Sequence, residues 1–182
     1  MRAGELRHVA DIMALDSDVQ ARCLGKSWFG IIAKEAAEPA YPTGLRNPSK
    51  IDIRARYNGK LLQGRYLRNG QRLFHITSVR DPLGNRAELR VTGEELIGEP
   101  AQLLPEGLAP RCVRVFMDYQ SPWRDENGQV IDYRIRAEVA LIEAGRVQTD
   151  DKLKVGGVTY LVTAIPSDMD DGIVRNLWLE PI

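Results

Sequence analysis

Alternation of apolar and polar side chains is the main pattern along this chain of 182 residues. Between Ile53 and Asn58 every second side chain is apolar or aromatic, and the same period of two runs from Tyr133 to Leu141. Such a period is typical of a strand with one face in a hydrophobic core and the other in solvent. The apolar run Trp28–Ala33 also suits a buried strand.

Turn signals separate the predicted strands. Asn69-Gly70 stands between two extended segments, and Asp81-Pro82-Leu83-Gly84-Asn85 precedes another. Residues 38–49 hold three prolines and a glycine, which predicts a loop. Val9–Leu15 fits helical and extended spacing equally, and residues 94–97 fit a short amphipathic turn. The pattern predicts an all-β protein of small antiparallel barrels or sandwiches, with little helix.

Part of the chain occurs twice, 86 positions apart. Leu67–Val79 returns as Leu153–Ile165, with Gly70 on Gly156 and Phe74 on Tyr160. After a loop two residues longer in the second copy, residues 87–91 correspond to 175–179, and ahead of the copies residues 51–56 correspond to 131–136. An internal repeat of this length predicts two related modules.

The repeat divides the chain into a module at residues 1–97, a linker at 98–110 and a second module at 111–182. The linker is assigned on its content of glycine and proline. Modules of roughly 85 residues bury a modest core. Each therefore gains from packing on the other or from oligomerisation.

Charge differs between the two halves although the net charge is zero. Residues 1–97 carry 16 Lys and Arg against 11 Asp and Glu, whereas residues 98–182 carry 9 against 14. Opposed fields of this kind can steer association between unlike surfaces. No apolar run approaches the ~20 residues that a membrane-spanning helix needs, and no leader-like segment opens the chain, so no membrane association is expected.

The basic residues concentrate between Arg54 and Arg90, where nine stand against two acidic residues. Arginines on an exposed strand face can neutralise phosphates without reading sequence. We therefore predict a basic DNA-channel or interface face at Arg54, Arg56, Arg68 and Arg72. Solvated strand faces would show the same pattern.

Motifs for catalysis, cofactor binding and metal binding are absent from the sequence. It has no glycine-rich nucleotide loop, no HExxH and no GxSxG, and its two histidines leave little for a nucleophile and base pair. Asp168, Asp170 and Asp171 could offer oxygen ligands, but their spacing favours a solvated hairpin loop. We predict no catalytic residue, no cofactor and no metal, and hence no enzyme.

Individual side chains carry further expectations. Cys23 and Cys112 lie 89 positions apart and are predicted to be buried, reduced thiols. His75 lies within a strand pattern and is predicted to be a packed or edge-facing side chain rather than a ligand or a base. The three tryptophans, Trp28, Trp123 and Trp178, are expected as core or interface anchors.

Short motifs follow each other in a fixed order through residues 1–97. They are Met1–His8, Trp28 at a short apolar strand, Arg54-Ala55-Arg56-Tyr57 before a polar turn, Gly70–Ile76, Val79-Arg80-Asp81-Pro82, and a last strand ending in Glu94-Glu95. This half of the chain resembles the head–tail joining (head-closure) proteins of tailed bacteriophages. Family members resemble a single module, whereas here a second copy follows. The early hairpin of the family looks altered between Asp16 and Ser27, and residues 125–128 look more like its usual tip.

The resemblance implies a structural protein of the virion neck, assembled in the host cytoplasm. Such a protein forms a homo-oligomeric, hexameric ring beneath the portal and its adaptor. The ring seals packaged DNA, which it can touch without sequence preference, and presents a surface to the tail-terminator or tail-tube protein. The resemblance implies no active site.

Other functions stay open at this point. A tail-terminator or tail-completion protein would have the same structural character. A tandem β-barrel that binds nucleic acid without sequence preference is the alternative from another class. An enzyme with an unrecognised carboxylate site has the least support.

Overall fold

A computed structural model describes residues 6–32, 44–124, 127–166 and 169–182. The chain divides into two compact units, residues 1–97 and 98–182. Both are built almost entirely from antiparallel strands, so the predicted all-β fold of two modules is confirmed. No helix within these ranges is long and apolar enough to cross a membrane.

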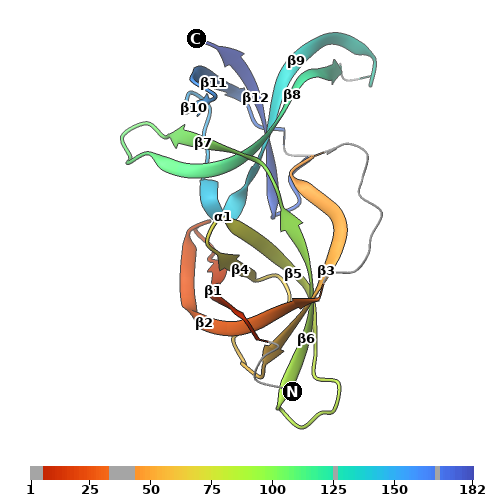
Figure 1. The fold of residues 1–182 in the computed structure, drawn as a ribbon. Coiled ribbons are helices and arrows are strands. Elements are labelled where there is room, and N and C mark those ends of the chain that lie inside the picture. Colours follow the sequence, from red (N-terminus) through yellow and green to blue (C-terminus); the bar gives the residue numbers. More distant parts are fainter. Residues whose placement is uncertain (1–5, 33–43, 125–126, 167–168) are drawn as a thin grey trace. The chain divides into compact units, whose positions relative to one another are not determined.

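The first unit is a closed barrel of six strands, called barrel 1 (Figure 1). Around the barrel the order is β1-β2-β3-β6-β5-β4, and β4 pairs back to β1. Its strands are β1 (His8–Leu15), β2 (Ala21–Ile32), β3 (Arg46–Arg56), β4 (Tyr66–Asn69), β5 (Arg72–Arg80) and β6 (Glu88–Leu96). The segment whose periodicity was ambiguous, Val9–Leu15, is therefore extended.

The second unit is barrel 2, which closes in the order β10-β11-β12-β9-β8-β7. Its elements are β7 (Glu99–Leu104), β8 (Arg111–Arg124), β9 (Val130–Ala140), a one-turn helix α1 (Leu141–Ala144), β10 (Lys152–Val155), β11 (Val158–Ala164) and β12 (Val174–Pro181). When the strands are matched in chain order, the two barrels have the same strand order. The predicted internal duplication is thus present in the topology.

A shared β-bulge shows how the two copies align. In barrel 1 the pairing of β5 with β6 skips Thr77, whose hydroxyl donates to the Thr92 carbonyl at 3.0 Å. In barrel 2 the pairing of β11 with β12 skips Thr163, whose hydroxyl donates to the Trp178 carbonyl at 3.3 Å. The two donors, Thr77 and Thr163, are 86 positions apart, and so are the two acceptors, Thr92 and Trp178. The offset of 86 therefore extends through β6 and β12.

This alignment corrects two details of the sequence-based repeat. The loop before β12 was expected to be two residues longer than its counterpart, but the pairing keeps Val91 equivalent to Leu177. Ahead of the core repeat, Ile53 pairs with Val91 and Ala137 pairs with Leu177. The strand equivalence is therefore offset by 84 positions, and the echo between residues 51–56 and 131–136 is out of register by four.

The predicted linker at 98–110 is wrong. Residues Glu99–Leu104 form β7, which pairs with both β8 and β10 and so closes barrel 2. The nearby prolines are tolerated because Pro100 is at the second position of the strand and Pro105 follows its end. The amphipathic turn expected at 94–97 is also wrong, since β6 continues to Leu96.

The loop expected at 38–49 is corrected in part. Residues 38–43 lie outside the described ranges, but β3 begins at Arg46. Pairing with β6 is irregular between Arg46 and Lys50, so Pro48 lies where the strand ladder is interrupted.

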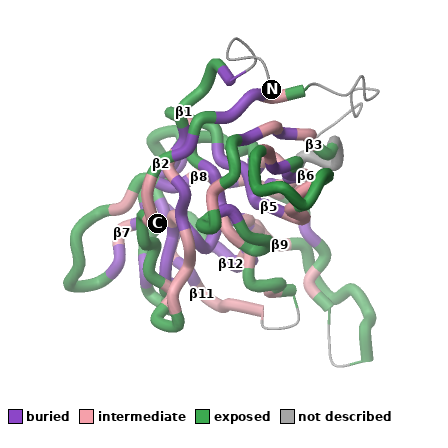
Figure 2. Tube along the Cα trace, turned by 90° about the horizontal axis from the view of Figure 1, so that it is seen from below, coloured by how far each residue is buried: buried purple, intermediate pink, exposed green. Residues whose placement is uncertain are grey.

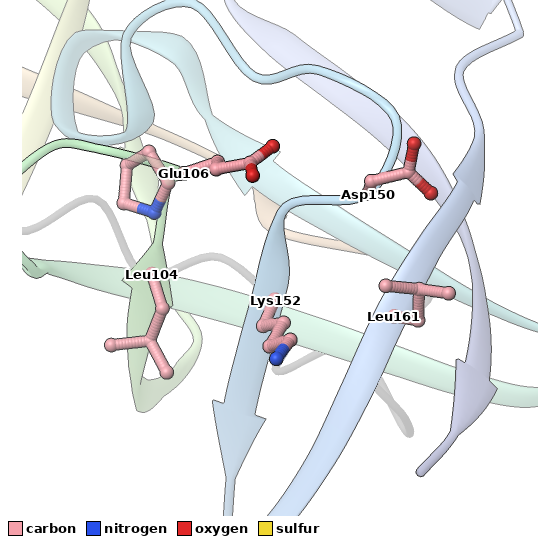
Figure 3. A pocket seen from close by; sticks show the side chains of 6 residues that line it. Leu104, Glu106, Asp150, Lys152 and Leu161 are labelled. Atoms are coloured by element: carbon pink, nitrogen blue, oxygen red, sulfur yellow. The ribbon is translucent and has the colours of Figure 1, made fainter.

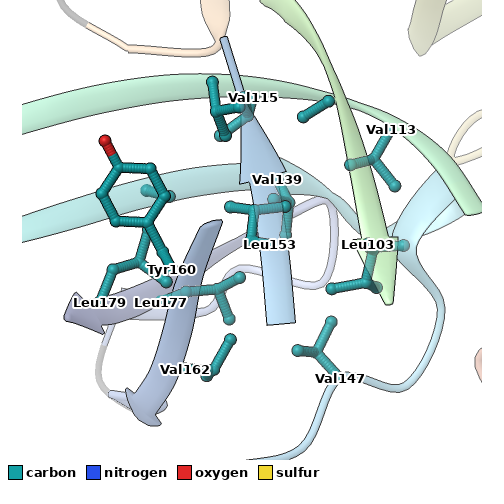
Figure 4. Packing of buried hydrophobic residues seen from close by; sticks show 14 residues of the cluster. Leu103, Val113, Val115, Val139, Val147, Leu153, Tyr160, Val162, Leu177 and Leu179 are labelled. Carbon is teal, nitrogen blue, oxygen red and sulfur yellow. The ribbon is translucent and has the colours of Figure 1, made fainter. Parts of the chain in front are cut away.

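Each barrel has its own hydrophobic core. In barrel 1 the largest fully buried side chains include Phe29, Phe74 and Ile76. In barrel 2 the core is mostly aliphatic, with Tyr160 as its one aromatic member among the described residues (Figure 4). Buried and exposed residues alternate along many strands, as the sequence period predicted (Figure 2). His75 is buried in β5, so its predicted packing is confirmed.

The segment before β4 and its counterpart before β10 share an unusual backbone conformation. Gly64 has φ 81° and Asp150, 86 positions later, has φ 73°. Gly64 N–H donates to the Ile76 carbonyl at 2.9 Å, and Asp150 N–H donates to the Val162 carbonyl at 2.9 Å. Positive φ is cheap for glycine and costly for residues with a Cβ. At this position the second copy therefore carries backbone strain that the first copy avoids with a glycine.

Replacement of Asp150 by glycine is expected to stabilise barrel 2 by about 0.5–1 kcal/mol, because the left-handed conformation is relieved. The converse change, Gly64→Ala, should destabilise barrel 1 by a similar amount. A Cβ at Gly64 would meet nothing within 4 Å, so this cost is conformational rather than steric. Urea unfolding of the full chain measures both. A D150G variant no more stable than the parent would contradict the prediction.

Candidate functional site

The four arginines predicted from the sequence do not form one face. Arg54 and Arg56 lie on β3, Arg68 on β4 and Arg72 on β5. Around barrel 1, β3 and β4 are separated by two strands in either direction. Arg68 therefore lies across the barrel from Arg54 and Arg56, which breaks up the predicted surface.

Arg68 and Arg72 are also engaged within barrel 1. A guanidinium nitrogen of Arg68 lies 3.7 Å from an Asp11 carboxylate oxygen. Arg72 donates two hydrogen bonds to Glu95, at 2.6 and 2.8 Å. These hydrogen bonds raise the pKa of Arg72, which stays charged.

Arg54 instead belongs to a line of three arginines across neighbouring strands, here called the arginine row. Arg54 on β3 is directly opposite Arg90 on β6, and Arg90 is directly opposite Arg80 on β5. Paired strands lie about 4.8 Å apart, so the row spans about 10 Å. Since Ile53 and Val91, their strand neighbours, belong to the core, the row lies on the outer surface of barrel 1.

Two of the three arginines of the row, Arg80 and Arg90, have no acidic partner among the described residues. Glu88 lies 3.6 Å from Arg54, but within the described residues Arg80 and Arg90 form neither an ion pair nor a hydrogen bond. Some arginines of barrel 1 differ: Arg46, for example, has a partner in Glu94 at 3.3 Å. Like charges directly opposite on adjacent strands destabilise a sheet. The arginine row thus lowers the stability of barrel 1 when no ligand is bound. A local cost in stability of this kind is typical of a ligand-binding surface.

A hollow of about 250 Å³ lies over the row. Besides the three arginines it is lined by polar groups of the next outward positions, Asp52, Ser78 and Thr92. The Thr92 hydroxyl donates to an Asp52 carboxylate oxygen at 3.3 Å. On the β2 side Gly30 is opposite Arg54 and adds no side chain there, while Ile32 of the same strand lines the hollow beside Asp52.

Trp28 is the nearest exposed aromatic residue along β2, two positions before Gly30 and on the same outward side. Its side chain is 57% exposed, so of the two places expected for it, a core or an interface, the core of barrel 1 is excluded. Trp178, in contrast, is buried and packs edge-on against Trp123 with ring centroids 4.8 Å apart. Trp28 therefore adds an exposed ring to the edge of the arginine-bearing surface.

Barrel 2 has no equivalent of the row. At the positions of Arg54 and Arg90 it carries Glu138 and Asn176, which are paired with each other in β9 and β12. The charge at this place therefore changes from basic to acidic and neutral between the copies, and the side chain of Asn176 is buried, where it donates to the Met169 carbonyl at 2.8 Å.

Barrel 2 has its own exposed feature, a hairpin that extends past the barrel. β8 pairs with β7 only up to Val115 and β9 pairs with β12 only from Ile135, so residues 116–124 pair only with β9 and residues 130–134 pair only with β8. We call these two segments the hairpin overhang (Figure 1). It exposes several apolar side chains: Tyr119, Val130, Ile131 and Tyr133.

Tyr119 connects the overhang to the core of barrel 2. Although most of its side chain is exposed, partial desolvation raises the pKa of Tyr119, and a hydrogen bond with Tyr160 adds to this shift. Trp123 is held by two contacts, the edge of Trp178 and the guanidinium of Arg134, 4.1 Å from its ring centroid. The overhang is therefore anchored at its base by side-chain packing.

A pocket of about 410 Å³ in barrel 2 gathers Glu106, Asp150 and Lys152 (Figure 3). No ion pair links these three side chains to any described residue. Beneath the same loops the buried Asp151 carboxylate accepts hydrogen bonds from Glu106 N–H at 3.1 Å and Gln148 N–H at 2.8 Å. These bonds position the loops, and nothing in the pocket pairs a nucleophile with a base.

The acidic loop before β12 is occupied with local contacts. Asp170 accepts from Gly172 N–H and binds Arg175 at 2.7 Å, and Asp171 accepts from the N–H groups of Ile173 and Val174. Asp168 lies outside the described residues. Among those described, no group of three His, Cys, Asp or Glu side chains could hold a metal ion.

The predicted burial of the cysteines is wrong. Cys23 and Cys112 are both free and exposed. Cys112 is at an outward position beside the core residue Val113, and Cys23 belongs to the exposed first residues of β2. The residue type suggested buried thiols, whereas the positions of the two cysteines on their strands leave both side chains exposed.

Sequence reasoning missed Arg80 and Arg90 as members of a site. The signal lay in the hairpin, since a turn centred near Asn85 places residues five before and five after it opposite each other. The predicted set was chosen by proximity along the chain, which does not report pairing across strands.

Comparison of the chain with family models, with curated proteins and with solved structures finds no match.

Proposed function

We propose that this chain is a structural neck protein of a tailed bacteriophage, of the head-closure type, that assembles as a homo-oligomeric ring. The ring would lie between the portal with its adaptor and the tail, where it seals packaged DNA and receives the tail-terminator or tail-tube protein. Support comes from the motif order in residues 1–97 and from the two small closed barrels.

One observation carries the proposal: the same barrel occurs twice with different outer surfaces. Arg54 and Arg90 in barrel 1 are replaced by Glu138 and Asn176 at equivalent places in barrel 2. A duplicated scaffold whose surfaces have diverged suits a connector with two unlike neighbours. A connector of this kind needs loops and strand edges rather than catalytic groups.

The hairpin overhang is the proposed docking element toward a neighbouring protein. It places Ile131, 61% exposed, and Tyr133, 66% exposed, in solvent. Aromatic and aliphatic side chains of this kind are the usual anchors of protein interfaces. In the ring they would become buried.

Assembly is expected when the purified chain is mixed with the portal, adaptor and tail proteins of the same virion. Native mass spectrometry should detect a ring of the chain and a complex with at least one of these proteins. The double variant Ile131→Ser/Tyr133→Ser should weaken such a complex by tenfold or more, because two interface anchors are lost.

A matched control is Val158→Ser, which changes an exposed apolar residue at the turn between β10 and β11. It should leave assembly unchanged. A chain that stays monomeric and binds none of these proteins would refute the proposal. Imaging of the intact neck, at a resolution that traces the chain, would separate a head-closure protein from a tail-terminator.

A further inference from the structure

We propose that the arginine row of barrel 1, formed by Arg54, Arg80 and Arg90, binds the phosphodiester backbone of nucleic acid. The inference rests on the geometry of barrel 1 alone and holds whether or not the chain forms a ring. It moves the basic surface predicted from the sequence to a different set of strands.

The chemistry of the row suits phosphate groups. A guanidinium offers several N–H donors in a planar fork that matches a phosphate bidentately. Three such groups in line, about 10 Å from end to end, can contact successive phosphates of one strand. The repulsion between Arg54, Arg90 and Arg80 is relieved when anions come between them, so binding gains from the unfavourable free state.

The hollow over the row gives a phosphate a place to sit. Its volume of about 250 Å³ is bounded by the hydroxyls of Ser78 and Thr92 as well as by the arginines. Among the described residues the Ser78 hydroxyl has no hydrogen-bond partner, so it can donate to a phosphate oxygen. Gly30 places no side chain opposite Arg54 on the β2 side, where Ile32 lines the hollow farther along the strand.

Two acidic residues limit the strength of this contact. Glu88 lies 3.6 Å from Arg54, and Asp52 lines the hollow. Both repel phosphate, so binding is expected to be modest and strongly salt-dependent. Contacts of guanidinium and hydroxyl groups with phosphates carry no sequence information, so recognition is expected to be independent of sequence. The exposed ring of Trp28 would add stacking only where bases are unpaired.

The test uses the full chain and labelled 20-mers of random sequence, one duplex and one single strand, with binding followed by fluorescence anisotropy over a series of KCl concentrations. The slope of log K against log [KCl] changes by about 0.9 per phosphate contact on duplex and about 0.7 on single strands. The variant Arg80→Ala/Arg90→Ala, which removes two phosphate contacts, should therefore reduce the slope by about 1.8 on the duplex and by about 1.4 on the single strand. A Trp28→Ala variant should weaken only single-strand binding.

Arg68→Ala is the matched control, because Arg68 is an exposed arginine of the same barrel on the far side from β3. It should leave both slopes unchanged. Loss of folding is tested by thermal melting. The Arg80→Ala/Arg90→Ala variant should melt at or above the parent temperature, since it relieves repulsion across the strands.

Several results would overturn the proposal. They are absence of binding to both oligonucleotides, an unchanged slope in the double variant, or an equal loss with Arg68→Ala. Competition by polyglutamate as effective as competition by an oligonucleotide of equal charge would mean general anion exchange, which also refutes a phosphate site. Because mass spectrometry measures assembly separately, failure here leaves the proposed neck function standing.

Discussion

Replacement of Phe74 by alanine is expected to destabilise barrel 1 by about 3–5 kcal/mol, the usual cost of deleting a fully buried aromatic ring. Phe74 is 0% exposed and packs edge-on against Phe29 with ring centroids 6.4 Å apart. The guanidinium carbon of Arg72 lies 4.8 Å from its ring centroid. The ring fills the core of a small barrel whose β-strands cannot easily close around a cavity. Denaturant unfolding of the full chain, with hydrogen exchange resolved by unit, measures the loss.

Tyr160→Phe is the matched control at the equivalent position of barrel 2. It keeps the ring and removes only the hydroxyl that bonds to Tyr119, so it should cost about 1 kcal/mol or less. The exchange protection lost in Phe74→Ala should be confined to residues 1–97. Equal effects of the two variants would mean that ring packing is not what holds barrel 1 together.

The second large effect is expected for Glu143→Ala, which should destabilise barrel 2 by about 3 kcal/mol. Glu143 lies in α1 and accepts hydrogen bonds from Arg114 Nε at 2.9 Å, Arg114 Nη2 at 2.8 Å and Arg114 N–H at 3.0 Å. Both side chains are largely buried, with 12% of Arg114 and 17% of Glu143 exposed. Removing the carboxylate takes the counter-charge from a guanidinium that solvent barely reaches. Urea unfolding provides the free energy.

A double-mutant cycle separates the pair from its surroundings. The coupling energy of Glu143→Ala and Arg114→Ala should be 1 kcal/mol or more, because the two groups are in contact. Arg114→Met/Glu143→Leu should recover much of the loss, since apolar pairs of similar volume often replace a buried ion pair well. Additive single variants would show that α1 is held to β8 by packing alone.

Much of the fold was accessible from the sequence because two signals agreed. The alternation around Ile53 and Ala55 predicted which side of β3 is buried. The similar segments around Phe74 and Tyr160 predicted two units with the same fold. β7 escaped because its proline and glycine neighbours resemble a linker, whereas its pairing with β8 and β10 depends on strands far along the chain. The helix α1 escaped because Leu141 continues the period of β9.

The candidate surface was less accessible for a related reason. Arg54 stood out through local charge density, but its neighbours Arg90 and Arg80 are defined by register across two strand pairs. Register follows from closure of the whole barrel, and a slip of one residue would turn each arginine toward the core. Local sequence therefore indicated that barrel 1 is basic without showing where its charges meet.

The strand edges of the hairpin overhang affect how readily copies of this chain aggregate through β-sheet pairing. Its outer strand segments leave backbone N–H and C=O groups unpaired, and such edges readily recruit foreign strands into mixed sheets. Pro122 has no N–H to offer, and the register irregularity between Asp118 and Ser121 breaks the straight run of donors and acceptors. Misdirected sheet growth is thereby discouraged, and recognition at this hairpin is left to its side chains.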